Sequence, residues 1–218
     1  MRREIKIPLN CNLENYFNNW LNFRNKIKKH HRDRIISSIY YDDENFKTAK
    51  DNLDGISNRR KYRIRWYNFD EHFKYEIKLK RNNVGQKVSL NSENNTQNLN
   101  DLFTNKNKFF KKKENIYFNG YLEPKNLKPK LKVNYLRSYF LYKNKVRITY
   151  DKKINYELLN KPSLVKNKIY DQMNVVELKF NEENLNLAVH LIRNSKFIPK
   201  RFSKYLRGLH LFGIANYI

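Results

Sequence analysis

In the stretch Arg59–Tyr67 (RRKYRIRWY), cations occupy every second position, which is the spacing of one face of a β-strand. Arg59, Lys61, Arg63 and Arg65 would stand on one face of a β-strand, with about 7 Å between neighbours. The positions between them are mostly bulky residues that favour strands. Because like charges side by side repel each other, such a face requires either bulk water or a bound anion to neutralise it.

Other segments share this alternation of apolar and charged positions, which predicts further β-strands. Each offers one apolar and one largely cationic face, which is typical of an antiparallel sheet. The predicted strands are 4–9, 35–41, 59–67, 73–80, 130–142, 145–151 and 175–180, with 116–122 as a further candidate. The pattern leaves two architectures open: an apolar core with cations in solvent, or a closed barrel with its polar face inward and helices outside.

Helical spacing marks the remaining elements. An apolar stripe from Leu13 to Ile27 predicts a first helix with Asn12 as its N-cap, ending in the basic segment that holds His30 and His31. A second helix is predicted around Leu185, Val189 and Ile192. A shorter one is predicted over 44–53, ending at Gly55. Residues 81–115 are interpreted as an insertion or loop, and 203–218 as a C-terminal helix and tail.

Composition limits the class of protein. The formal net charge is +25, and 39% of the residues are hydrophobic, so a packed core and a polyanionic partner are both expected. Cys11 is the only cysteine, which excludes a disulfide framework and a thiolate zinc site. The N-terminal segment has no hydrophobic signal core and no stretch is long enough to span a bilayer, so we expect a cytoplasmic location.

A set of short motifs recurs in a definite order along the chain. They are REIK (3–6), SIYYD (38–42), Gly55, RIR (63–65), EIK (76–78), YLR (135–137), RITYD (147–151), ELK (177–179) and SKY (203–205). In this order and spacing the chain resembles the VTC domain, the polyphosphate polymerase domain of the triphosphate tunnel metalloenzyme superfamily, which is CYTH-like. The resemblance covers about residues 3–206, so we expect a single domain over 1–218. It implies an α+β fold, a closed antiparallel β-barrel whose lumen is a basic tunnel flanked by helices.

The resemblance also implies the residues of the site. The phosphate-binding candidates are Lys6, Arg63, Arg65, Lys78, Tyr135, Arg137, Arg147, Ser203 and Lys204, with Tyr135, Ser203 and Lys204 on the outer phosphates. The residues expected to act in catalysis are Arg63, Arg65, Lys78, Arg137, Arg147 and Lys204. Glu177 is the expected ligand of Mn²⁺ or Mg²⁺, with Glu4 and Glu76 as further candidates. Arginine forks, lysine charges and hard carboxylate oxygens suit phosphate and these metals on chemical grounds as well.

The first strand departs from the wider superfamily. Where tunnel triphosphatases and cyclases carry E-x-E-x-K, this chain has Arg2, Glu4 and Lys6 at the corresponding positions. The loss of one carboxylate favours a polymerase, because a terminal phosphate oxygen is already anionic and needs no strong base. ATP and polyphosphate are the expected partners. A triphosphatase, a binding module for polyphosphate or inositol pyrophosphate, and a separate membrane-bound partner stay open.

Several residues have a plainer interpretation. Arg59, Lys61, Lys74 and Lys80 line a tunnel rim or are solvated, Asp42 and Asp43 cap a helix, and Asp151 is structural. For Glu76 a role in an ion pair that separates neighbouring cations is favoured over a metal site. A nucleic-acid partner is not expected, since no helix-turn-helix, zinc-finger or RNA-recognition signature is present.

Overall fold

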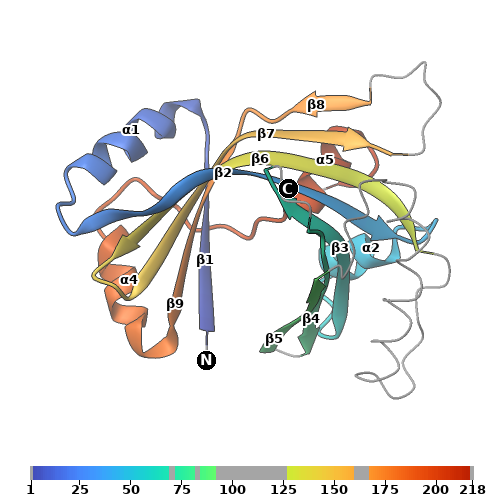
Figure 1. Cartoon of the computed structure of the whole chain (residues 1–218), viewed down its shortest axis with the longest axis horizontal. Helices are drawn as coiled ribbons and strands as arrows, with labels where there is room; N and C mark the ends of the chain where they lie inside the picture. Colours follow the sequence, from blue (N-terminus) through green and yellow to red (C-terminus); the bar gives the residue numbers. More distant parts are fainter. Residues whose placement is uncertain (1, 69–71, 82–83, 92–126, 160–166, 217–218) are drawn as a thin grey trace. The chain divides into compact units, whose positions relative to one another are not determined.

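The computed structural model describes residues 2–68, 72–81, 84–91, 127–159 and 167–216. Its strands are β1 (Arg2–Leu9), β2 (Ile27–Asp42), β3 (Arg59–Tyr67), β4 (Lys74–Arg81), β5 (Val84–Asn91), β6 (Lys128–Tyr142), β7 (Val146–Leu158), β8 (Lys168–Tyr170) and β9 (Asn174–Asn181). Its helices are α1 (Cys11–Asn22), α2 (Lys47–Leu53), the 3₁₀ turn η1 (Glu182–Asn184), α4 (Leu185–Ile192) and α5 (Lys204–Leu211). Figure 1 labels the strands and the α-helices along the chain.

The strands form one sheet in the order β1-β9-β7-β6-β2-β3-β4-β5, with β8 added to β7. The neighbouring pairs β1–β9, β9–β7, β2–β3, β3–β4 and β4–β5 are antiparallel. The expected α+β class with an antiparallel sheet is therefore confirmed. The expected closed barrel is wrong: β1 and β5 are the two ends of the strand order and do not pair with each other within the described ranges. Closure would require these two edges to exchange ladder hydrogen bonds.

The predicted strands that fall on described residues are present, and the bounds of Arg59–Tyr67 are reproduced. The first helix is shorter than predicted, because β2 already begins at Ile27. His30 and His31 therefore lie in a strand rather than at the end of a helix. The helix N-cap is Asn10, whose side chain accepts a hydrogen bond from the Leu13 amide, and not Asn12.

Two further predictions concern the segment after β4. β5 lies within the segment 81–115 that was interpreted as a loop, so that interpretation is wrong over Val84–Asn91. Residues 92–115 and the candidate strand 116–122 lie outside the described residues. None of the described helices is both long and apolar enough to cross a bilayer.

The chain divides into two compact units. The first comprises Met1–Ile35, Asn134–Asn155 and Tyr170–Ser203, and the second comprises Ile36–Val133, Tyr156–Ile169 and Lys204–Ile218. The strands β2, β6 and β7 contribute residues to both units.

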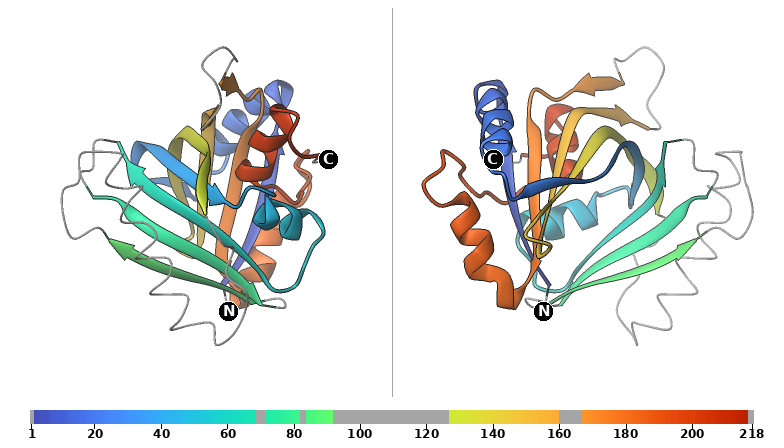
Figure 2. Two further views of the ribbon diagram at one scale, coloured as in Figure 1. Left: turned by 90° about the vertical axis from the view of Figure 1, so that its right-hand side faces the viewer. Right: turned by 60° about the vertical axis from the view of Figure 1, so that its left-hand side comes forward.

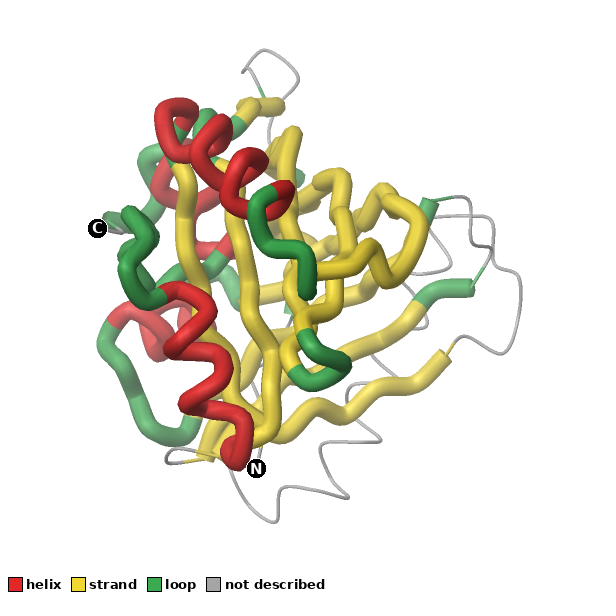
Figure 3. Tube along the Cα trace, turned by 90° about the vertical axis from the view of Figure 1, so that its left-hand side faces the viewer, coloured by secondary structure: helices red, strands yellow, loops and turns green. Residues whose placement is uncertain are grey.

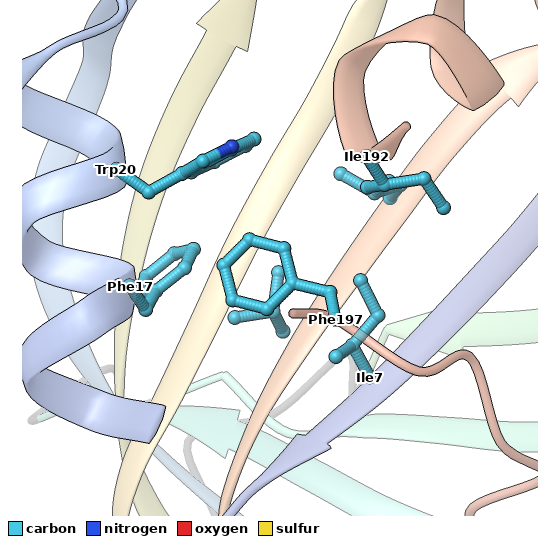
Figure 4. A pocket seen from close by; sticks show the side chains of 7 residues that line it. Ile7, Phe17, Trp20, Ile192 and Phe197 are labelled. Carbon is cyan, nitrogen blue, oxygen red and sulfur yellow. The ribbon is translucent and has the colours of Figure 1, made fainter. Parts of the chain in front are cut away.

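In the first unit, α1 and α4 lie on one side of β1 and β9, as Figure 3 shows. The apolar faces of these helices and strands form a common core, which includes Ile7, Phe17, Leu178 and Leu191, each with no more than 1% of its surface exposed. Figure 4 shows the aromatic part of this core, where side chains from β1, α1, α4 and the loop after α4 point toward one another. The residues that line it are Ile7, Phe17, Trp20, Val176, Leu178, Ile192 and Phe197, and they leave no space for a water molecule.

In the second unit, β3, β4 and β5 run side by side, as both views in Figure 2 show. Their apolar positions form a core with Ile39, Tyr62, Ile64 and Ile77, which are buried. Helix α2 is capped by Asp42, whose carboxylate accepts hydrogen bonds from the amides of Thr48 (2.9 Å) and Ala49 (3.1 Å). The cap that the sequence predicted for this residue is confirmed.

Candidate phosphate and metal sites

Charged residues of the first unit meet on one face of β1, β9 and β7. The register places Glu4 opposite Lys179, which in turn lies opposite Arg147. Two residues further along, Lys6 lies opposite Glu177, which lies opposite Thr149. Because side chains two residues apart share a face, these two rows lie on the same side of the sheet. We call this set, with Arg137 and Asp151, the mixed-charge face.

Ion pairs connect the two rows. Lys6 Nζ is 2.9 Å from Glu4 Oε1 and donates a 3.0 Å hydrogen bond to the Phe202 carbonyl oxygen. Lys179 Nζ is 2.8 Å from Glu177 Oε2 and 3.7 Å from Glu4 Oε2. One ammonium thus approaches both carboxylates. Burial alone would raise the pKa of Glu177, but the charges of Lys179, Lys6 and Arg137 hold that pKa well below its usual range.

Arg137 on β6 completes the mixed-charge face. Its Nε and Nη2 donate to Asp151 Oδ1 and Oδ2 at 2.5 and 2.7 Å, a bidentate pair, and Nη2 is 3.8 Å from Glu177. The guanidinium lies 5.2 Å from the ring centre of Tyr135. Although burial disfavours its charge, Asp151 and Tyr135 keep the pKa of Arg137 well above its usual value. The structural role predicted for Asp151 agrees with this pair.

A divalent metal fits the donors of this face. Glu4 and Glu177 supply hard carboxylate oxygens. One cation can approach both of them, since the Lys179 ammonium does so in this structure. The described residues contain no group of three or more His, Cys, Asp or Glu side chains arranged to hold a metal, so phosphate oxygens and water would complete the coordination. The buried Thr149 hydroxyl, opposite Glu177, makes no hydrogen bond within the described structure, which also suits a ligand here.

The second unit carries a different charged face, on β3, β4 and β5. The register pairs Arg59 with Lys80, Lys61 with Lys78, Arg63 with Glu76, Arg65 with Lys74, and Lys78 with Lys87. Cations thus lie directly opposite cations on neighbouring strands, and Glu76 is the single carboxylate on these positions of the three strands. We call this set the cationic face. Like charges in directly opposed positions destabilise a sheet, so an anion bound here would relieve repulsion.

Glu76 is the centre of the cationic face. Its Oε2 is 2.5 Å from Arg63 Nε and its Oε1 is 2.9 Å from Lys87 Nζ, and its side chain is only 3% exposed. Despite burial, which would raise it, the charges of Arg63, Arg65 and Lys87 lower the pKa of Glu76 to about 2. Both oxygens are engaged by cations, which matches the ion-pair role predicted for Glu76.

Strand β2 contributes neighbours of Arg65, which is buried, and of Arg63, which is partly buried. Arg63 Nη1 donates to Tyr40 Oη at 3.4 Å, and Arg65 Nε donates to Ser38 Oγ at 3.1 Å. The Tyr40 ring stacks on Tyr205 of α5, with ring centres 5.1 Å apart. Burial raises the pKa of Tyr40, but the charges of Arg63 and Arg65 outweigh it and lower that pKa.

The structure places the remaining candidates as follows. Lys78 and Arg147 are exposed, Ser203 directly precedes α5, and Lys204 is the first residue of that helix. Sequence reasoning omitted Lys87, Lys179 and Thr149 from the site. Their alternation with apolar neighbours gave a signal for each face, but only the strand register shows that Lys179 also meets Glu4 and that Lys87 meets Glu76.

Comparisons with known proteins show which family model and which solved structures the chain resembles. A family model described as the VTC domain matches residues 3–212. A search of the curated proteins gave no match. Among solved structures, a protein of Pyrococcus horikoshii is similar with a TM-score of 0.54 and 13% identity, covering 98% of this chain and 99% of that one.

Two further structures share the fold. A candidate adenylyl cyclase of Hippeastrum, described as having a dominant triphosphatase activity, gives a TM-score of 0.55 at 12% identity and covers 98% of each chain. A candidate adenylate cyclase of Bacillus halodurans gives 0.54 at 12% identity, covering 99% of this chain and 91% of that one. At these identities the likeness supports the fold alone.

Proposed function

Because the chain belongs to the VTC domain family, we propose that it is a metal-dependent polyphosphate polymerase that uses ATP as its phosphoryl donor. The cationic face is the observation that carries this proposal. Its directly opposed cations with one carboxylate among them suit a substrate and a product that are both chains of phosphate groups.

The proposed reaction joins two anions. A terminal oxygen of phosphate or polyphosphate attacks the γ-phosphorus of ATP, the bond from that phosphorus to the bridging oxygen breaks, and ADP leaves with the electron pair. The nucleophile is anionic at neutral pH, so the barrier is mainly repulsion and positioning. Arg63 and Arg65 can bind equatorial oxygens bidentately, while Lys78 and Lys87 act as point charges.

The mixed-charge face supplies the metal-binding part of the proposal. Glu177 and Glu4 would hold Mn²⁺ or Mg²⁺, which neutralises charge on the phosphate oxygens. Arg137 is oriented by Asp151, and Lys6 by the Phe202 carbonyl, so both present fixed donors to phosphate. Tyr135, Arg147, Ser203 and Lys204 are assigned to further phosphate contacts in the same proposal.

A triphosphatase is the second candidate, favoured by the activity described for the Hippeastrum protein of the same fold. The cationic face would bind its triphosphate equally well. The two candidates differ in the acceptor, since water gives orthophosphate whereas phosphate gives a polymer. A binding module without turnover would give neither product.

The experiment incubates purified protein with γ-labelled ATP and Mn²⁺, then resolves polymer, orthophosphate and ADP. The proposal expects a labelled phosphate polymer and equivalent ADP, with synthesis lost in Arg65→Ala and Glu177→Gln. Lys145→Ala is the matched control, because Lys145 is exposed in the β6–β7 turn and belongs to neither face. Orthophosphate as the only product would establish the triphosphatase instead, and synthesis unaffected by both site variants would refute the residue assignments.

A further inference from the structure

Lys179 occupies an unusual position in the mixed-charge face. Its ammonium lies 2.8 Å from Glu177 and 3.7 Å from Glu4, the same two carboxylates that the proposed function assigns to the metal. A divalent ion that binds both carboxylates must therefore compete with this ammonium. In the ligand-free protein, the Lys179 ammonium is thus the cation that pairs with both proposed metal ligands.

Charge balance makes this competition consequential. Lys6, Arg137, Arg147 and Lys179 share this face with Glu4, Asp151 and Glu177, so the face already carries one positive charge in excess in the absence of ligand. A divalent ion added to this set would increase that excess beside Arg137 and Glu177, whose side chains are only 11% and 10% exposed, which is costly. Lys179 can relieve the excess only by moving away from Glu177 toward an anion.

The exposure of Lys179 and the residue beside it both allow its ammonium to move away from Glu177. Its side chain is 23% exposed, whereas that of Glu177 is 10% exposed, so the ammonium can leave while the carboxylate stays. On β7 the residue directly opposite Lys179 is Arg147, which is exposed. An ammonium released from Glu177 would thus join a neighbouring guanidinium, and two adjacent cations are a natural site for a phosphate group.

We propose that Lys179 couples metal binding to phosphate binding by competing with the metal for Glu177 and Glu4. Metal alone binds weakly because it must displace the ammonium into water beside Arg147. Metal with phosphate binds well because the displaced ammonium gains a phosphate oxygen. By linkage, phosphate strengthens metal binding by the same factor as metal strengthens phosphate binding. This inference rests on the metal assignment of the proposed function.

The test measures Mn²⁺ binding without any phosphate, by the electron paramagnetic resonance signal of free Mn²⁺. Lys179→Met keeps the length of the side chain and removes its charge, so it should tighten Mn²⁺ binding about tenfold, and Lys179→Arg should remain close to the natural protein. Lys179→Gln is measured in parallel, so that a folding defect in one variant leaves the other available. Circular dichroism verifies the fold of each.

Two controls assign the effect to this site. Lys145→Met removes one positive charge from the exposed β6–β7 turn and should leave Mn²⁺ affinity unchanged. Glu177→Gln, introduced together with Lys179→Met, should abolish the gain. Folded Lys179→Met and Lys179→Gln proteins that bind Mn²⁺ no more tightly than the natural protein would overturn the inference, as would a gain that survives Glu177→Gln.

The result of this Mn²⁺-binding test is independent of whether the protein synthesises polymer, since no nucleotide is present. A gain in Mn²⁺ affinity in a protein that makes no polymer would refute the polymerase and leave the competition standing. Polymer synthesis with no gain would do the reverse.

Discussion

The two charged faces of the molecule are built from the same residue types in opposite ways. On β1 and β9 of the mixed-charge face, acid lies opposite base: Glu4 faces Lys179, and Lys6 faces Glu177. On β3 and β4 of the cationic face, base lies opposite base, as Lys61 faces Lys78. The charges of the first face are largely balanced by its own side chains, whereas the second needs an anion. Removing a cation from the cationic face should therefore stabilise the ligand-free protein and weaken anion binding. Removing a cation from the mixed-charge face should destabilise the ligand-free protein.

The largest effect is expected for Arg65→Ala on the cationic face. Arg65 is only 8% exposed and donates a hydrogen bond to Ser38, so it is a preorganised donor. We expect the rate of polymer synthesis to fall by about 10²–10³, the usual cost of losing such a donor. Steady-state synthesis from ATP measures it, with the exposed Lys78→Ala as the milder comparison. A loss below about threefold would remove Arg65 from the reacting centre.

Glu76→Gln removes the one carboxylate of the cationic face and should destabilise the protein. The folded-state pKa of Glu76 is lowered from 4.5 to about 2, so its stabilising contribution is complete above pH 4.5 and is lost as the pH falls toward about 2. The shift corresponds to about 3 kcal/mol at neutral pH. Urea unfolding at pH 7 should show this loss, and the stability of the variant should change less between pH 4.5 and 2 than that of the natural protein. Equal pH profiles for the two proteins would show that the carboxylate is not ion-paired in solution.

Inorganic tripolyphosphate should stabilise the protein by relieving repulsion on the cationic face. At a concentration of 100 Kd the expected gain is about 2.7 kcal/mol, visible as a rise in Tm that shrinks as salt is added. Hydrogen exchange should slow more in β3 and β4 than in α1, which carries neither face. Protection spread evenly over all described elements would indicate non-specific binding to a basic protein.

The smallest expected effects concern whether loss of one lysine charge raises or lowers the stability of the protein on each face. Lys78→Met removes a cation that lies opposite Lys61 and Lys87, and should raise stability at low salt by a few tenths of a kcal/mol to about 1 kcal/mol. Lys6→Met removes the partner of Glu4 and should lower stability by about 1 kcal/mol. Thermal unfolding in low and high salt compares the two variants. Changes of the same sign would mean that the two faces do not differ in electrostatic balance.

Much of the fold could be predicted because strand alternation is a local property. The bounds of β3 follow from its alternation alone, since each position declares its face. The first half of β2 could not be predicted, because the run KKHHRDR offers no apolar face and Ile27 continues a helical stripe by coincidence. β5 was missed because Asn-rich neighbours give its sequence the composition of a loop.

The candidate site was predictable in composition but not in pairing. The motifs name Glu177, Arg137 and Arg63, yet the sequence does not give the register that sets Lys179 beside Glu4 or Lys87 beside Glu76. Long-range pairs depend on how strands align, and alternation fixes the face of a residue without fixing its partner. The closed barrel was expected from the family resemblance, and the end strands β1 and β5 contradict it.

The most direct measurement is a crystal structure with Mn²⁺ and a non-hydrolysable ATP analogue, recorded at the manganese absorption edge. We expect an anomalous peak at Glu177 with the Lys179 ammonium moved away from that carboxylate, and triphosphate oxygens on Arg63 and Arg65. A triphosphate held only by exposed lysines outside the two faces, with no manganese at Glu177, would contradict this expectation.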